Sequence, residues 1–213
     1  MKRVLALIPR KPDTSRESFR DHYETVHAPL GMSVLGDIPH YVRNHVAATI
    51  GEVEPTFDVL SEFGYADAKE MKAVTERLAT KELGDPIRAD ELSFLDKPRI
   101  AVLLLDRVAM RSESSPTATA ETHKLVLLEK VPSDANRSAF IRRHVQRVDG
   151  LRDATSCVSF ESLDSRTQYD VVSFFRYPTS SFDANAIRKE LVSEDRALLL
   201  RVDECATKVS QAW

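Results

Sequence analysis

The stretch SRESFRDHYETVHAPL, residues 15–30, is the most informative part of this 213-residue chain. It follows the short apolar run Val4 to Ile8, which Pro9 ends and which is typical of a buried strand. Within the stretch, apolar side chains recur at the spacing of a helix, namely Phe19, Tyr23, Val26 and Leu30. A strand followed at once by an amphipathic helix predicts a domain that packs helices on a sheet.

The two ends of this helix have recognisable signals. Thr14 and Glu17, three residues apart, form a capping-box pair at its start. Pro29 disfavours helical geometry in the residue before it. We therefore expect a helix from about Ser15 to His27.

The rest of the first half alternates between strand and helix patterns. The predicted elements are a strand at 40–49, a strand at 58–65, a helix at 67–80, a loop with a short helix at 83–98 and a strand at 99–108. The resulting order, β-α-β-β-α-β, is that of a ferredoxin-like unit.

The second half repeats this pattern. Residues 3–19 match 124–140 in spacing, and 57–65 match 169–177. The first match aligns Tyr23 with His144 and His27 with Val148. The second half predicts a strand at 123–130, a helix at 134–148, strands at 155–162 and 169–177, a helix at 184–192 and a strand at 197–204. So long a period indicates duplication of a whole small domain.

We therefore predict an α+β fold made of two ferredoxin-like units. The first unit, 1–109, carries the functional site, and the second, 123–213, is a degenerate copy without the terminal histidine of the motif. Residues 110–122 contain Ser, Thr, Ala and Pro without apolar periodicity, so we expect a linker there.

Composition argues for an ordinary globular protein with a small-molecule or protein partner. Hydrophobic residues make up 42% of the chain, and its net charge is −3 without clusters of basic residues, which argues against nucleic-acid and membrane partners. The first apolar run is too short for a secretory signal, and no later run reaches membrane-span length. Two cysteines, Cys157 and Cys205, make no disulfide framework, so we expect a cytoplasmic protein.

The histidines carry no known metal-binding spacing. Four of the six lie between His22 and His45, but there is no H-E-x-x-H motif. His22 and His27 are five residues apart, about 140° around an α-helix, so they should not share a face. No glycine-rich phosphate loop is present either. We expect no metal and no cofactor.

The pattern Phe19-Arg-x-x-Tyr23-x-x-x-His27-Ala-Pro-Leu30, followed by Tyr41-Val-Arg-Asn-His45, resembles the EthD-type members of the dimeric α/β-barrel superfamily. The likeness covers about Arg3 to Leu105 and includes the acidic-aromatic segment 90–96. It is weaker over 124–204, where Val-Asp-Gly-Leu at 148–151 replaces His-Ala-Pro-Leu.

The resemblance implies that two ferredoxin-like units form one α/β barrel within a single chain, which leaves an additional homodimer open. It also implies chemistry on phenolic or polyketide-type aromatic compounds without metal or organic cofactor. Family members act as dehydratases, decarboxylases, cyclases or oxygenases.

His27 and Tyr23 are the candidate catalytic residues. An imidazole exchanges protons readily near neutral pH, so His27 is the candidate general acid/base. The alternative for His27 is a helix C-cap. Tyr23 lies one turn earlier and could donate to a substrate oxygen, or it could simply belong to the apolar stripe.

Tyr41, Arg43 and His45 alternate onto one face of their predicted strand and are the candidate substrate-binding residues. Arg43 could neutralise a substrate carboxylate or phenolate, and His45 could carry a second proton. If Val42 and its neighbours form the packed face, the candidates face solvent or a cavity, and Asn44 is buried with its amide tied to the backbone. The alternative for Arg43 is a solvated or ion-paired surface residue.

These candidates together predict a cofactor-independent lyase of dehydratase or decarboxylase type, acting on an aromatic or polyketide-like molecule by proton transfer through His27. Two alternatives stay open. One is a cofactor-free monooxygenase, and the other is a non-catalytic binding or stress-response module.

Overall fold

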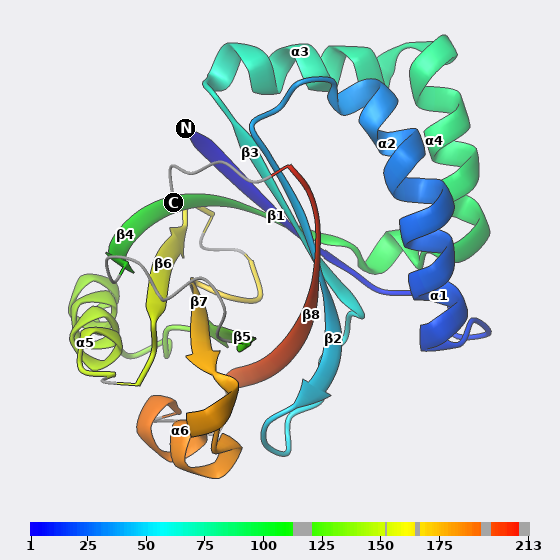
Figure 1. Ribbon diagram of the computed structural model, residues 1–213. Helices are drawn as coiled ribbons and strands as arrows, with labels where there is room; N and C mark the ends of the chain where they lie inside the picture. The colour runs from blue at the N-terminus through cyan, green and yellow to red at the C-terminus, as the bar shows by residue number, and fades with distance from the viewer. Residues whose placement is uncertain (113–120, 152, 165–166, 193–196, 209–213) are drawn as a thin grey trace. The chain divides into compact units, whose positions relative to one another are not determined.

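A computed structural model of the protein describes residues 1–112, 121–151, 153–164, 167–192 and 197–208 (Figure 1). The elements of the first half are β1 Lys2–Ile8, α1 Arg16–His22, the π-helix η1 Tyr23–His27, α2 Ala28–Leu35, β2 His40–Thr49, β3 Val59–Tyr65, α3 Ala68–Ala79, α4 Lys81–Phe94, the 3-10 turn η2 Lys97–Arg99 and β4 Ala101–Ser112. Those of the second half are β5 Thr122–Glu129, α5 Arg137–Asp149, β6 Ser156–Ser162, β7 Val171–Pro178, the 3-10 turn η3 Thr179–Ser181, α6 Ala184–Leu191 and β8 Leu198–Lys208.

The strands follow the hydrogen-bonded order β1-β3-β2-β8-β5-β7-β6-β4, which is that of a closed barrel. The pairs described strand by strand are antiparallel, for example β1 with β3 and β5 with β7. The prediction of an α+β fold with a barrel is confirmed. Both halves also follow the predicted β-α-β-β-α-β order, while their origin by duplication stays a prediction.

By its contacts the chain divides into two compact units. The N-terminal unit comprises Met1–His45, Thr56–Val102 and the part of β8 from Glu204, and the C-terminal unit comprises Val46–Pro55 and Leu103–Asp203. The predicted linker begins inside β4, which runs to Ser112, and its central residues 113–120 lie outside the described residues. The predicted domain boundaries stay a prediction.

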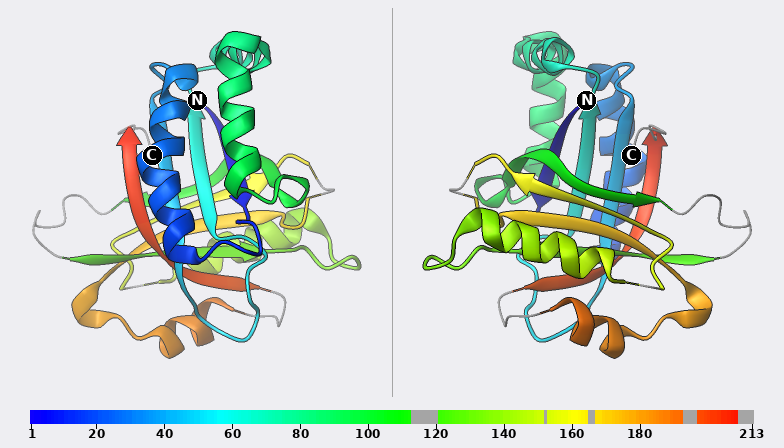
Figure 2. Two further views of the ribbon diagram at one scale, coloured as in Figure 1. Left: turned by 90° about the vertical axis from the view of Figure 1, so that its right-hand side faces the viewer. Right: turned by 90° about the vertical axis from the view of Figure 1, so that its left-hand side faces the viewer.

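In the N-terminal unit, α1, η1 and α2 form one continuous helical run that lies beside α4 (Figure 2). The run begins at Ser15, whose hydroxyl accepts from the backbone N–H of Ser18 at 3.1 Å, so the cap is Ser15 and not Thr14. The predicted end near His27 is wrong, because Ala28 has helical dihedral angles of φ −65° and ψ −44°.

Pro29 is accommodated by a change of helix type. A proline lacks the N–H that an α-helix needs, and its ring collides with the carbonyl four residues earlier. Here the turn just before Pro29 widens to a π-helix, in which the N–H of Ala28 donates to the carbonyl of Tyr23. The helix therefore passes the proline instead of stopping at it.

The segment 83–98, predicted as loop and short helix, is mostly the long helix α4. Gly84 and Pro86 discourage a helix in the sequence, yet Thr80 caps its start by accepting from the N–H of Leu83 at 3.3 Å. A Cβ on Gly84 would lie 1.9 Å from the carbonyl oxygen of Leu78, so this glycine permits the close approach of α3 and α4.

Each unit has its own apolar core. That of the N-terminal unit gathers buried residues of its helices and sheet, among them Phe19, Tyr23, Tyr41, Ile87 and Phe94. That of the C-terminal unit includes Leu125, Val148, Phe175, Ile187 and Leu199. None of the helices in the described ranges combines the length and the apolar character needed to cross a membrane.

Candidate functional site

The π-helix η1 brings two histidines to one carboxylate. His27 Nδ1 lies 2.8 Å from Asp90 Oδ2, and His22 Nε2 lies 2.7 Å from Asp90 Oδ1, with Asp90 on α4. The expectation that His22 and His27 face different sides is wrong. It assumed an α-helix, whereas one turn of a π-helix holds an extra residue and returns residues five apart to nearly the same side.

This cluster is largely shielded from solvent. The side chains of His27 and Asp90 are 10% and 11% exposed, and that of His22 is 33% exposed. The ring of Phe94 packs against both imidazoles, with centroid distances of 4.4 Å to His22 and 5.3 Å to His27. The pairing with Asp90 is therefore held in a mostly apolar setting, where hydrogen bonds to a charged group are strong.

His27 is oriented for proton exchange at its second nitrogen. When Nδ1 donates to Asp90, the neutral ring presents Nε2 as an acceptor, and the carboxylate stabilises the imidazolium that forms when Nε2 takes a proton. Within the described part of the chain, Nε2 has no hydrogen-bond partner.

Tyr23 is buried and its hydroxyl is already engaged. The hydroxyl lies 2.9 Å from Ser61 Oγ on β3, and the ring packs edge-on against His27 at a centroid distance of 4.8 Å. Burial raises the pKa of Tyr23 to about 12, although hydrogen bonds with Ser61 and Tyr41 lower it. The phenol is therefore neutral at ordinary pH and cannot act as a base.

Tyr41, Arg43 and His45 share one face of β2, as predicted, but that face packs beneath the helix. All three are buried, so this face is not open to solvent. Opposite them on η1, Glu24 accepts from Arg43 Nη2 at 2.5 Å and from His45 Nε2 at 2.7 Å.

The charge of Arg43 is thus neutralised inside the protein. Its guanidinium binds both oxygens of Glu24, donates to Thr207 Oγ1 and lies 4.7 Å from the centre of the Tyr41 ring. Burial raises the pKa of Glu24, but the hydrogen bonds from His45 and Arg43 prevail and lower it to about 2. Of the two alternatives for Arg43, the ion pair is the one found, although it is buried and not on the surface.

The opposite face of β2 agrees with the prediction. Asn44 is fully buried, and its Nδ2 donates to the carbonyl of Leu60 at 3.0 Å and to Glu62 Oε1 at 2.7 Å. The amide is therefore tied to the backbone of β3.

Glu24 and Asp90, the two carboxylates that organise the site, are not among the residues predicted for it. Both lie in segments that the motif marks, since Glu24 follows Tyr23 and Asp90 opens the acidic-aromatic segment 90–96. Their pairing with histidines depends on the π-turn and on how α4 packs, neither of which has a periodic signal in sequence.

The N-terminal unit is therefore an α+β domain in which carboxylate–histidine contacts join the helical run of α1, η1 and α2 to α4 and to β2. Residues 11–98 match the model of the EthD domain family, the family that the sequence resembles. A search of curated proteins found no match.

Several solved structures share the fold of the whole chain. One, from Lactobacillus acidophilus NCFM, carries a provisional monooxygenase assignment; it has 7% identity and a TM-score of 0.57, over 98% of this chain and 96% of that one. Another is described as an anthrone oxidase-like protein, with 8% identity and a TM-score of 0.57, over 100% of this chain and 96% of that one. A third, provisionally assigned as a chlorite dismutase, has 10% identity and a TM-score of 0.51, over 95% of this chain and 96% of that one. At such identities these likenesses establish the fold alone.

Proposed function

We propose that the N-terminal unit is a small-molecule enzyme whose reaction moves a proton through His27. The observation that carries this proposal is the 2.8 Å contact between His27 Nδ1 and Asp90 Oδ2. A carboxylate at that nitrogen fixes the tautomer, orients the ring and stabilises the protonated form, which are the requirements of a general acid/base.

The reaction class we propose is a cofactor-independent lyase of dehydratase or decarboxylase type, on an aromatic, phenolic or polyketide-like molecule. In a dehydration, His27 Nε2 removes a proton from carbon, and the same proton can leave with the departing hydroxyl as water. Phe94 and Tyr23, which flank the imidazole, support an aromatic substrate.

The proposed roles of the other candidates follow from their contacts. Tyr23 positions the His27 ring by packing against it. Arg43 and His45 hold Glu24, and through it η1, so we assign them to positioning and not to substrate binding. Tyr41 lies under the helix with Tyr23 and stays a proposed neighbour of the site.

A cofactor-free monooxygenase is the second candidate. Its support is the fold likeness, at a TM-score of 0.57, to one protein provisionally assigned as a monooxygenase and to one described as anthrone oxidase-like. Proton removal by His27 would suit this reaction as well, because a phenolate or carbanion reacts with oxygen more readily than its neutral parent.

Mass spectrometry on a panel of phenolic acids and polyketide-like aromatics, under air and under nitrogen, tests the proposal. We expect product in both atmospheres from the wild type, and loss of about 10²-fold or more of the rate in His27→Ala. His123→Ala is the matched control, since His123 lies in the C-terminal unit against Phe182.

The outcomes separate the candidates. Product that requires air and contains added oxygen would identify the monooxygenase. Full turnover by His27→Ala would refute the role of His27. Binding of a compound without any product would indicate the non-catalytic module.

A further inference from the structure

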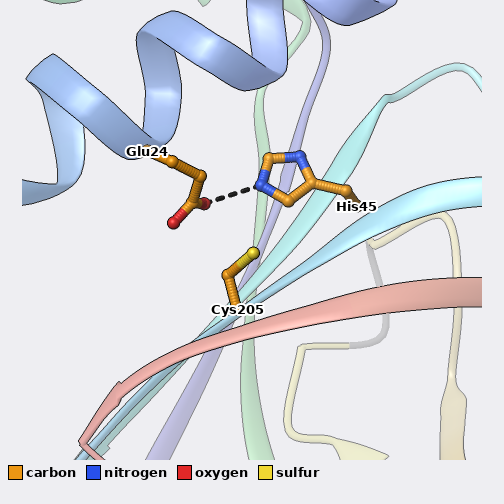
Figure 3. Close-up of side chains that lie close together, drawn as sticks. All are labelled: Glu24, His45 and Cys205. Carbon is orange, nitrogen blue, oxygen red and sulfur yellow. Dashed lines mark hydrogen bonds and ion pairs between the residues drawn. The ribbon is translucent and has the colours of Figure 1, made fainter.

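A carboxylate, an imidazole and a thiol converge on the side of η1 that faces β2 and the end of β8. Glu24, His45 and Cys205 each offer one ligand atom, and these three atoms all lie within 4.8 Å of one another (Figure 3). The residues come from η1, β2 and β8, so no sequence spacing could reveal the set. All three belong to the N-terminal unit.

The set matches the ligand chemistry of zinc. Zinc in proteins is bound by thiolate, imidazole and carboxylate, and its catalytic sites use three protein ligands with a fourth position for water. With bonds of about 2.0–2.3 Å, ligand atoms in a tetrahedral zinc site lie roughly 3.3–3.6 Å apart. Here Glu24 Oε1 and His45 Nε2 are 2.7 Å apart, and the thiol lies within 4.8 Å of both, so side-chain movements of about 1 Å would suffice.

The surroundings provide support for the ligands and a route of entry. Arg43 donates to both oxygens of Glu24, at 2.5 Å to Oε2 and at 3.2 Å to Oε1, while Oε1 also lies 2.7 Å from His45 Nε2. Outer hydrogen bonds of this kind orient ligating carboxylates. The Glu24 side chain is 21% exposed and Cys205 is partly exposed, so an ion can reach them. Arg20, which donates a hydrogen bond to the thiol, is the group that an ion would displace.

We propose that Glu24, His45 and Cys205 form a zinc site with water as the fourth ligand. On binding, Glu24 Oε1 and His45 Nε2 give up their mutual hydrogen bond and each donates a lone pair to the ion. The Cys205 thiol binds as thiolate and releases its proton to solvent. The site is separate from the His27–Asp90 pair and does not depend on the proposed acid/base reaction.

Metal titration of the full chain tests this proposal. We expect about one equivalent of Zn²⁺ in competition with a chromophoric chelator, and at least a tenfold weaker affinity in Cys205→Ala and in His45→Gln. Co²⁺ in place of Zn²⁺ should show a thiolate-to-metal charge-transfer band that Cys205→Ala abolishes. Cys157→Ala is the matched control, because Cys157 is buried in the C-terminal unit.

His45→Gln also removes the imidazole hydrogen bond to Glu24, so the unfolding curve of this variant is measured alongside. Loss of the cobalt band in Cys205→Ala is a readout that does not depend on His45→Gln. Two results would overturn the proposal. One is binding that Cys205→Ala leaves unchanged. The other is binding lost in His27→Ala instead, which would place the ion at the Asp90 cluster.

Discussion

The two units present a serine hydroxyl at matching positions of a strand, but they meet it with different side chains. In the N-terminal unit the Tyr23 hydroxyl lies 2.9 Å from Ser61 Oγ, and in the C-terminal unit His144 Nε2 lies 2.7 Å from Ser173 Oγ. The two sequence matches between the halves pair Tyr23 with His144 and Ser61 with Ser173. A histidine of the C-terminal unit thus occupies the place of a tyrosine core residue.

The units also differ in how the histidine nitrogens are used. In the C-terminal unit, His144 Nδ1 binds Glu129, which Arg147 also contacts, and both His144 and Glu129 are buried. Both ring nitrogens are therefore occupied. The N-terminal unit places its histidine one turn later, at His27, where Nδ1 binds Asp90 and Nε2 has no partner among the residues that the structure describes. A carboxylate–histidine pair is present in both, so the free nitrogen distinguishes a candidate catalytic group from a structural one.

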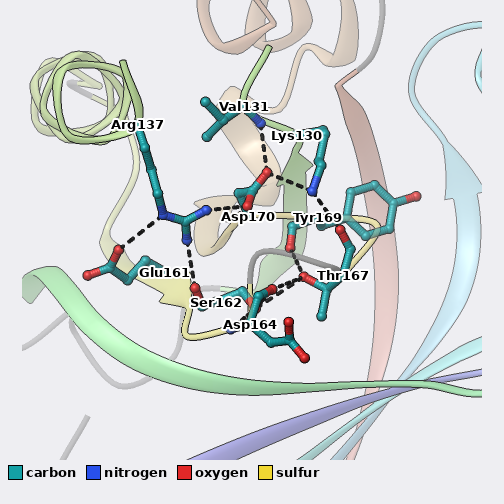
Figure 4. Close-up of polar contacts among 9 residues, drawn as sticks. All are labelled: Lys130, Val131, Arg137, Glu161, Ser162, Asp164, Thr167, Tyr169 and Asp170. Atoms are coloured by element: carbon teal, nitrogen blue, oxygen red, sulfur yellow. Dashed lines mark hydrogen bonds and ion pairs between the residues drawn. The ribbon is translucent and has the colours of Figure 1, made fainter. Parts of the chain in front are cut away.

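Both units share one set of contacts, which we call the anchor: an aspartate that accepts from a backbone N–H after the first strand and from an arginine of the helix. Asp58 accepts from the backbone N–H of Arg10 at 3.1 Å and from Arg16, and Asp170 accepts from the N–H of Val131 at 3.0 Å and from Arg137 (Figure 4). The same offsets relate these pairs. The two halves thus agree in the contacts that join strand to helix and diverge at the helix face where the site lies.

The largest loss of stability should come from removing Glu129, the buried carboxylate of the C-terminal unit. Glu129→Ala leaves His144 and Arg147 without their buried carboxylate, and removing one partner of a buried charge pair costs about 3–5 kcal/mol. Asp90→Ala should lower the free energy of unfolding by only about 1 kcal/mol, because His22 is 33% exposed and water can replace its contact with Asp90. Urea unfolding of both variants measures this difference. Equal losses in the free energy of unfolding would show that burial does not distinguish the two carboxylate–histidine pairs.

Turnover should respond to Asp90 without a comparable loss of stability. Asp90→Asn keeps the shape of the side chain but cannot stabilise the protonated His27, so we expect turnover to fall by about 10²-fold, or ~2.7 kcal/mol. Glu91, one residue along α4, pairs with Lys97 and not with a histidine, so Glu91→Gln should keep full activity. Steady-state rates on any substrate found in the panel compare the two; an equal fall in both would point to a general effect on α4.

The shared anchor should be stronger where it is better buried. Asp170 is 3% exposed and Asp58 is 13% exposed. Asp170→Asn should lower the free energy of unfolding by about 2 kcal/mol and Asp58→Asn by about 1 kcal/mol, as expected for lost hydrogen bonds to a charged group. Equal losses from the two substitutions would contradict this ranking.

The pH dependence gives a second measure of Asp170. Burial raises its pKa, but hydrogen bonds from the N–H of Val131, from Lys130 and from Arg137 prevail and lower it. A lowered pKa in the folded state means that the stabilisation is complete above the unfolded value, about 3.9, and is lost as the pH falls below it. The free energy of unfolding, measured from pH 7 down to about pH 2, should therefore fall less at low pH for Asp170→Asn than for the wild type.

The sequence predicted the elements whose periodicity is strong. The strand 40–49 matches β2 at both ends, and the helix 67–80 contains α3 with Asp67 and Thr80 as its caps. The predictions are wrong where tertiary packing overrides a residue that disfavours helices, namely at Pro29 and at Gly84. The candidates Tyr23, His27, Tyr41, Arg43 and His45 are brought together in one unit. Their carboxylate partners were missed because a pair 63 residues apart, such as His27 and Asp90, has no local pattern.

The smallest predicted effect concerns the helix caps, where the two units should behave alike. Ser15 accepts from the N–H of Ser18 at 3.1 Å, and Asn136, its counterpart in the second half, accepts from the N–H of Ala139 at 2.9 Å. Replacing either by Ala removes one capping hydrogen bond, so each should lower the free energy of unfolding by about 1 kcal/mol. Ser138→Ala, at an exposed position inside α5, provides the control for a lost hydroxyl without a lost cap. If one cap proves far more important than the other, the two helices are anchored differently, and the contrast between the units extends beyond the site to the start of the helix itself.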